Sequence, residues 1–461
     1  MPEPPPHSGS PGPEEAKLIA ELASPDSQEA AHAARRLGSL RASHARIPLE
    51  RALRGSDVHL RLAAASALGQ IRDPRSRISL EARLRDEDRH VRAQAAFSLS
   101  RLPDPRSVPV LIETLTQDGS ALVRNSSAIA LGRIGDPRAI PVLERALEDE
   151  SDRVRREAVV ALERSKDPDA ARKVRRLLRD PARRVRIVAA LVIGLRRDAE
   201  AVPDLGEYAR RADVWEKPAL LVALGRIGTP DCEPLLTRFA NDPARWVRVC
   251  VLHGLAEMRA PSGKTVARDK LNDPAWAVRG AAALALGRLG TPGDVAALVR
   301  RLRDPSAWVR RAAIYALGQL GAVSESGRIR RALEDSDPEV QLAAIWAAGQ
   351  LHDSRSVPHL LRALEGASPH APATPRVMAE GDGAVRLVSD ADSRRFDALV
   401  QALGAIVSDR GDPSVFDALR EARRRVPAAE LDRPARLPTP LGSGKGTRSL
   451  RSLFDEAGSG P

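Results

Sequence analysis

Tryptophan is the residue type whose placement in this sequence most directly suggests the recognition of a partner. All five tryptophans lie between residues 215 and 346, and Trp215, Trp246 and Trp308 are separated by 31 and 62 residues. An indole combines a large apolar ring with an N–H donor, and it is among the side chains that dominate protein interfaces. The sequence therefore predicts a partner-binding region formed by Trp215, Trp246, His253, Trp276, Trp308, Arg311, Tyr315 and Trp346.

A second candidate is a concentration of basic residues between 164 and 197. This stretch has twelve basic and three acidic side chains, a net charge of +9 in a chain whose total is +12. A patch of this kind would neutralise several phosphates of a nucleic acid. The alternative is a solvated face in a chain that is rich in arginine throughout. The residues of this basic patch are Arg172, Lys173, Arg175, Arg176, Arg179, Arg183 and Arg184.

Patterns typical of catalysis or cofactor binding are weak. Residues 442–447, GSGKGT, resemble the phosphate loop of adenylate kinases, but Thr439 stands in place of the first Gly and no strand pattern precedes it. Such a loop needs amides held between a strand and a helix. Cys232 and Cys250 form no CxxC motif, and no Ser-His-Asp or Cys-His pairing stands out. The sequence favours a protein that is not an enzyme, and we expect no cofactor and no metal site.

The elements that position these residues repeat every 31 residues. A basic residue, which we call the basic slot, recurs at this interval with one step of 32, and a small residue, usually Gly, follows eight positions later. A unit this short cannot bury its own apolar face, so neighbouring units must stack and share one core. The basic slots are Arg61, Arg92, Arg124, Arg155, Arg186, Lys217, Arg248, Arg279 and Arg310, with Gln341 in the next position.

Each unit is predicted to be a pair of antiparallel helices. In the unit that begins at residue 136, Asp136 is a favoured N-cap and Pro137 is favoured in the first turn. Apolar residues recur at helical spacing, and a second helix follows from Val154. Glycines mark the end of the second helix. Gly287, for example, lets neighbouring helices pack closely, and Gly290 suits a left-handed C-terminal cap. The predicted fold class is all-α, a superhelical α-solenoid of about twelve stacked helix pairs.

The tryptophans occupy a defined place in this repeat. Trp215, Trp246 and Trp308 lie two residues before a basic slot, a position that we call the Trp column. The side chains found in the Trp column of other units show the tolerance of a partly exposed site; they are His59, His90, Leu122, Arg153, Arg184, Ala277 and Glu339. A second column, five residues after the slot, is apolar in the early units and becomes His253, Leu284, Tyr315 and Trp346 in the later ones.

The stretches DPSAWVRRAAIYALGQLG at 304–321 and DGSALVRNSSAIALGRIGDPRAIPVLERAL at 118–147 resemble HEAT repeats, and among them the short bacterial repeats named after phycobilisome lyases. The resemblance covers residues 16–365, and 394–425 more weakly. It implies a ladder of hydrogen bonds between the Arg of the basic slot and an Asp six residues before a slot, so that most basic slots are internal braces. It also offers an alternative for the tryptophans, which is packing over the Asp-Pro turn of their own repeat.

The leading functional hypothesis is a non-catalytic scaffold that binds a protein or peptide on the surface of the solenoid. A nucleic-acid-binding protein that uses the basic patch is the first alternative, and an accessory protein similar to the bilin lyases is the second. Some HEAT-repeat hydroxylases bind two irons through His-Glu dipeptides, but none of the nine histidines here is followed by Glu.

The sequence also predicts the organisation of the chain. We expect a disordered segment at 1–13, the repeat array at 14–365, an inserted mobile loop at 366–393, a last, degenerate helix pair at 394–425 and a disordered tail at 426–461. No basic start with an apolar stretch marks a signal peptide, and no run approaches the ~18 apolar residues of a membrane span. We therefore expect a cytoplasmic protein.

Overall fold

The computed structural model describes residues 11–164, 168–365, 376–379, 385–388, 390–407 and 413–426. It divides into two compact units, Met1–Ala223 and Leu224–Pro461, which we treat separately. The structure confirms the predicted fold class. Its described residues form twelve successive helix pairs, one further helix and a single two-stranded hairpin.

Unit 1 contains the first six helix pairs and the first helix of the seventh. Short 3₁₀ turns flank many first helices, as η5 (Pro137–Ala139) does before α9. The first helices are α1 (Pro13–Glu21), α3 (Arg46–Ala52), α5 (Arg77–Ala82), α7 (Val108–Gln117), α9 (Ile140–Ala146), α11 (Pro168–Arg176) and α13 (Val202–Arg211). The second helices are α2 (Ser27–Leu40), α4 (Val58–Ile71), α6 (Arg89–Leu99), α8 (Ala121–Ile134), α10 (Asp152–Ala161) and α12 (Arg183–Arg196), and α14 (Lys217–Ile227) spans the boundary between the units.

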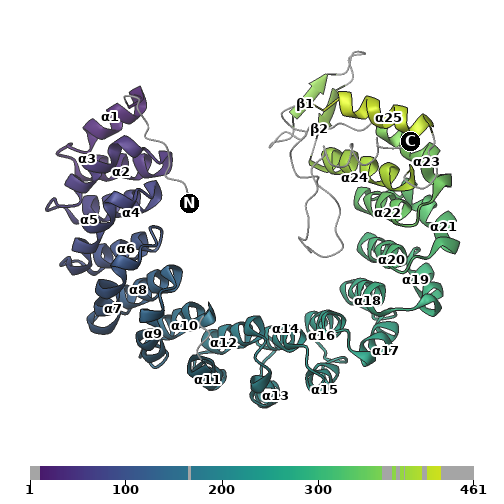
Figure 1. Cartoon of the computed structure of the whole chain (residues 1–461), viewed down its shortest axis with the longest axis horizontal. Coiled ribbons are helices and arrows are strands. Elements are labelled where there is room, and N and C mark those ends of the chain that lie inside the picture. Colours follow the sequence, from purple (N-terminus) through teal and green to yellow (C-terminus); the bar gives the residue numbers. More distant parts are fainter. Residues whose placement is uncertain are drawn as a thin grey trace. The chain divides into compact units, whose positions relative to one another are not determined.

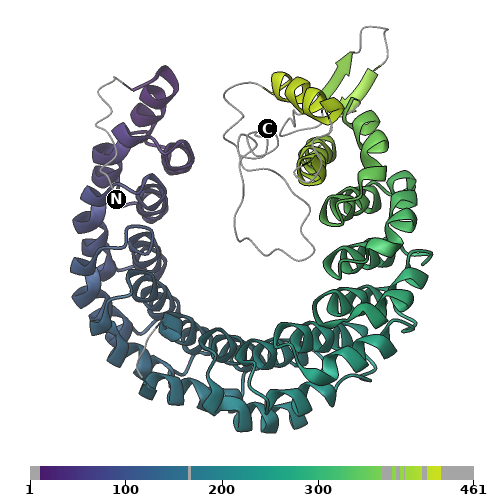
Figure 2. The ribbon, with the colours of Figure 1, turned by 45° about the vertical axis from the view of Figure 1, so that its right-hand side comes forward.

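Unit 2 continues the same alternation. Its first helices are α15 (Cys232–Thr237), α17 (Pro261–Lys270), α19 (Val295–Arg301), α21 (Ser326–Arg331) and α23 (Val357–Glu365). Its second helices are α16 (Arg245–Glu257), α18 (Trp276–Leu289), α20 (Ala307–Gln319), α22 (Pro338–Gln350) and α24 (Asp390–Val407), and α25 (Pro413–Arg424) follows. Within each unit the even-numbered helices lie side by side in one layer and the odd-numbered helices in the other (Figures 1 and 2).

The predicted insert at 366–393 separates the two helices of the twelfth pair, α23 and α24. Within it, β1 (Arg376–Ala379) and β2 (Val385–Val388) pair antiparallel with Arg376 opposite Val388, which the sequence did not predict. The other described part of the insert is the start of α24. The mobility of the insert and the disorder of both termini stay predictions, because residues 1–10, 427–461 and most of the insert lie outside the described residues.

Hydrogen bonds between arginine and aspartate join successive repeats, as the resemblance implied. Arg279 donates through Nε and Nη2 to the carboxylate of Asp304 in the next repeat, both at 2.8 Å. Its Nη1 donates to the carbonyl of Asp273 at 3.0 Å, within its own turn. The same pattern links Arg92–Asp118, Arg124–Asp149 and Arg155–Asp180 in unit 1, and Arg248–Asp273 and Arg310–Asp335 in unit 2. Arg61 donates to Asp86 through Nη2 alone, at 2.9 Å. These basic slots are therefore internal braces.

The ladder changes its carboxylate at one irregular repeat of unit 1. Arg186 pairs with Glu216 at 2.5 Å, where other units use an Asp. Glu216 is buried and also accepts the backbone N–H of Asp213 at 2.8 Å. The carboxylate of Glu216 thus has both roles that an aspartate has elsewhere in the ladder. It pairs with the arginine of the preceding repeat, and it accepts a backbone N–H of its own turn.

The predicted glycine caps are correct with one exception. Gly135, Gly228 and Gly321 have φ of 70°, 72° and 64°, in the left-handed region. The prediction for Gly290 was wrong, because its φ is −71°. There the chain turns through a capping box in which the Thr291 N–H donates to Asp294 at 2.8 Å, so a left-handed residue is not needed.

Removing one partner of a ladder bond should destabilise the array. The Asp304 side chain is 3% exposed, so Arg279→Met leaves a buried carboxylate with only a 3.8 Å ion pair to Arg301 and should cost about 2–4 kcal/mol in urea unfolding. The control is Arg172→Met, since the Arg172–Asp169 pair is 63% exposed at both ends and should contribute less than about 1 kcal/mol. Equal losses in the two variants would contradict the bracing role.

The ladder also makes stability depend on pH. The hydrogen bond from Arg310 holds the pKa of Asp335 below its ordinary value of 3.8. Burial is the largest single effect on Asp304 and would raise its pKa, but the hydrogen bonds from Arg279 and the Ser306 N–H, together with the charges of Arg279 and Arg301, outweigh burial and lower this pKa too. A carboxyl group whose pKa is lowered by folding stabilises the protein above its unfolded-state pKa, and this contribution is lost as pH falls through the folded-state pKa.

We therefore expect the urea midpoint to fall as the pH is lowered below about 4, the region where aspartates titrate. Asp335→Asn should be less stable than the wild type at neutral pH and should show a smaller fall on acidification. Unfolding curves at several pH values measure both effects. The same pH dependence in the variant and the wild type would exclude Asp335 as a contributor.

Candidate partner-binding groove

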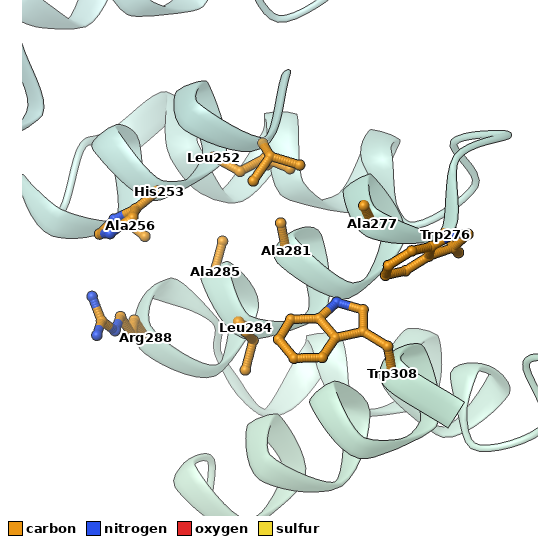
Figure 3. Close-up of a pocket in the computed structure, with 11 residues that line it drawn as sticks. Leu252, His253, Ala256, Trp276, Ala277, Ala281, Leu284, Ala285, Arg288 and Trp308 are labelled. Atoms are coloured by element: carbon orange, nitrogen blue, oxygen red, sulfur yellow. The ribbon is translucent and has the colours of Figure 1, made fainter. Parts of the chain in front are cut away.

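Unit 2 carries an apolar groove on its layer of second helices. The groove has a volume of about 350 Å³ and lies along α16, α18 and the start of α20 (Figure 3). The same α18 helix buries Val278, Ala282 and Leu286 in the core, so the groove uses its other side. The lining residues are Val249, Leu252, His253, Ala256, Trp276, Ala277, Ala281, Leu284, Ala285, Arg288 and Trp308.

The repeat explains why the groove forms here. Trp308, in the Trp column of the α20 unit, packs against the preceding helix at Gly280, where an added Cβ would lie 2.1 Å from the indole Nε1. The residue equivalent to Gly280 in the α16 unit is Val249, and the Trp column residue that faces it is Ala277. Val249 has the Cβ that Gly280 lacks, so an indole could not pack here as Trp308 packs on Gly280. With the small Ala277 in this position, the space beside Val249 stays open as part of the groove.

The wall formed by Trp308 is held by charged neighbours. The guanidinium carbon of Arg311 lies 4.4 Å from the centroid of the Trp308 ring, a cation–π contact. Arg311 also pairs with Glu339 at 3.0 Å, and Arg394 pairs with the same glutamate at 3.0 Å. Trp308 thus packs against Gly280 of the neighbouring repeat and contacts Arg311 of its own helix.

Tyr315 and Trp346 form a separate packed pair. Their ring centroids are 5.1 Å apart with an interplanar angle of 65°, and Trp346 also packs over Gly318. Burial raises the pKa of Tyr315 to about 12, so its hydroxyl is neutral at physiological pH. These two residues do not line the groove.

The structure brings together part of the predicted binding region and separates the rest. His253, Trp276 and Trp308 line one groove, and Trp276 is 52% exposed at its rim. Trp246 is exposed at the start of α16 but does not line the groove, and Trp215 is exposed in unit 1. The sequence reasoning missed Ala277, Ala281 and Leu284; the signal was an Ala in the Trp column between two repeats that carry Trp.

Most of the predicted basic patch is engaged in ion pairs. Arg175 donates to Asp198 at 2.7 Å and also pairs with Glu200, while Lys173 pairs with Glu144 at 2.8 Å. Only Arg176 and Arg184 are exposed without a carboxylate partner among the described residues. The other pairs are Arg172–Asp169, Arg179–Glu207 and Arg183–Asp213. Much of the patch's charge is therefore neutralised within the protein.

The remaining sequence candidates give no second site. The GSGKGT segment at 442–447 lies outside the described residues. Cys232 is buried, and burial raises the pKa of the Cys250 thiol, which makes it less reactive. In the part of the chain that the structure describes, no group of His, Cys, Asp or Glu is arranged to hold a metal ion, and no helix has the length and apolar character for a membrane span.

Comparison with known families places the repeat. A family model described as HEAT repeats matches residues 15–90, 79–163, 143–219, 265–327 and 304–371, more than half of the chain. The chain therefore belongs to the HEAT-repeat family. The unmatched stretch 220–264 follows the irregular repeat at Glu216. No curated protein matches the sequence.

Solved structures show the same fold at low sequence identity. Yeast importin-beta, Kap95p, is 12% identical with a TM-score of 0.60, covering 89% of this chain and 63% of that one. A structure of Kap95p with RanGDP is 14% identical with a TM-score of 0.54, covering 97% and 67%. The CpcE–CpcF complex of phycocyanin lyase from Nostoc sp. is 25% identical over 51% of this chain and 97% of that one, but its TM-score of 0.34 supports no argument.

The two tryptophans of the groove should differ in their contribution to stability. Trp308→Ala removes an indole that packs on Gly280 and Arg311, and should cost about 3 kcal/mol in urea unfolding. Trp276→Ala removes an exposed ring and should cost less than about 1 kcal/mol. Similar losses for both would show that Trp276 is a packing residue and not a free surface.

Proposed function

We propose that this protein is a non-catalytic scaffold that binds a protein or peptide in the groove of unit 2. The observation that carries the proposal is an apolar groove with a half-exposed indole, Trp276, at its rim. A contiguous apolar surface of this kind is costly in water and is typical of a binding site.

The remaining surface features are consistent with this function. The HEAT-repeat fold presents a layer of parallel second helices, so side chains from α16, α18 and α20 converge on one ligand. Kap95p, which has the same fold, binds RanGDP, so this fold is compatible with protein binding. The ion pairs of Arg175 and Lys173 favour a protein partner over a nucleic acid, because little unpaired positive charge is left for phosphates.

Selection from a random peptide display library against the full-length protein tests the proposal. Selected peptides should bind the wild type, and Trp276→Ser should weaken them by at least about tenfold, as expected when a central aromatic residue is removed from an interface. Fluorescence anisotropy with labelled peptides measures the affinity.

The matched control is Trp215→Ser, which removes an indole that is 64% exposed but belongs to unit 1. This variant should bind the selected peptides as the wild type does. If Trp276→Ser binds them unchanged, the groove is not the binding site.

A further inference from the structure

We infer that the space above Ala277, which we call the socket, binds one bulky apolar side chain of a ligand that also carries a carboxylate. The inferred ligand is the chain's own tail: Phe454 enters the socket, and Asp455 and Glu456 supply the carboxylates. The inference rests on the proposed function, since it identifies the chemistry that the groove recognises. It also makes the tail a competitor of the external partner.

The shape of the socket follows from the repeat. The Trp column carries an indole at Trp246 and at Trp308 but only a methyl group at Ala277. Ala281 and Ala285 extend this row of small side chains along α18, and Leu252 of α16 forms the opposite wall. A single aromatic or branched aliphatic side chain inserted here would bury apolar surface beside Ala277, much as Trp308 does at Gly280 in the next repeat.

The positive charge of Arg288, at the end of the groove, favours a ligand that carries a carboxylate. Arg288 lines the groove seven residues after Ala281 on α18. Its side chain is exposed and has no carboxylate partner among the described residues. Arg279 of the same helix and Arg311 of the next second helix are both paired with acids. His253, the other polar residue of the lining, has its own carboxylate neighbour, Glu257, at 3.8 Å.

The spacing between these features is short. Eleven residues of α-helix separate Ala277 from Arg288, or about 16 Å at 1.5 Å per residue. An extended peptide covers that length in about five residues, and in fewer once the reach of the arginine and of the acidic side chain of the ligand is included. The ligand should therefore carry its carboxylate one to three residues from its apolar anchor.

The tail of this chain has such a sequence. Phe454 is the only aromatic residue after Phe416, and Asp455 and Glu456 follow it directly. The other acidic residues after Val426, Glu430 and Asp432, have Leu431 between them and prolines nearby, but no aromatic residue. Phe454 in the socket would place its two carboxylates within reach of Arg288.

The tail is long enough to reach. Phe454 is 28 residues beyond Val426, the last described residue. A random coil of that length spans about 30 Å on average, and a fully extended chain about 90 Å. The helices α18, α20, α22 and α24 are successive neighbours within unit 2. At 8–10 Å per step, about 30 Å separates α24 from α18.

Photo-crosslinking of the full-length protein tests the position of the tail. With p-benzoylphenylalanine in place of Phe454, the crosslink should map to peptides of α16 or α18 within the same chain. Ala277→Trp, which fills the socket with the side chain of the neighbouring repeats, should reduce that crosslink at least fivefold. Crosslinks to other helices, or between two copies of the chain, would overturn the inference.

Binding of a labelled peptide of residues 448–461 supplies the second measurement. Full-length Phe454→Ser should bind it at least fivefold more tightly than the wild type, because the internal competitor is lost. In the Phe454→Ser background, Ala277→Trp should abolish binding and Arg288→Ala should weaken it about tenfold. The control is Arg300→Ala, which removes an exposed arginine on α19, outside the groove.

The two proposals fail in different ways. If Trp276→Ser weakens the display-selected peptides but Phe454→Ser and the 448–461 peptide have no effect, the tail inference is wrong and the binding function stands. If Trp276→Ser leaves the display-selected peptides unaffected, the groove itself is not a binding site and both proposals fail.

Discussion

The bond between an arginine of one repeat and an aspartate of the next is the interaction on which this structure depends. The guanidinium joins three groups at once: two carboxylate oxygens of the following repeat and a carbonyl of its own turn, as Arg279 does with Asp304 and Asp273. Because each repeat is too small to bury its own core, stability comes from contacts between neighbours. Where the bond is planar and bidentate, as between Arg279 and Asp304, it fixes the offset between the two neighbours.

This use of arginine changes the meaning of the chain's positive charge. A net charge of +12 suggests an acidic ligand when it is read from composition. In the structure, many arginines are internal braces, and five of the seven residues of the basic patch pair with carboxylates. Arg288 differs from these arginines, because it lies exposed at an apolar groove and pairs with no carboxylate among the described residues.

The groove forms because one repeat carries a smaller side chain than its neighbours at an equivalent position. The interior of a regular array is filled because each position meets the equivalent position of its neighbour. At Ala277 a small residue stands where the flanking repeats have an indole, while Gly280 lets Trp308 pack closely against the preceding second helix, α18. The result is an apolar space that is bounded by rigid helices, so its shape is set before any ligand binds. Such preorganisation reduces the entropy lost on binding.

The sequence by itself determined the repeat, the helix pairs and most of the glycine caps, because each depends on residues that recur at a constant spacing. The ladder was implied by the resemblance to HEAT repeats. It also identified Trp276, Trp308 and His253 as candidates. The tertiary structure alone decided which candidates meet, since Tyr315 and Trp346 pack with each other whereas Trp276 lines a groove. It also decided the cap at Gly290 and the pairing of the basic patch. A column of equivalent residues shows which side chains share an environment, but not whether the space between two neighbouring columns is filled.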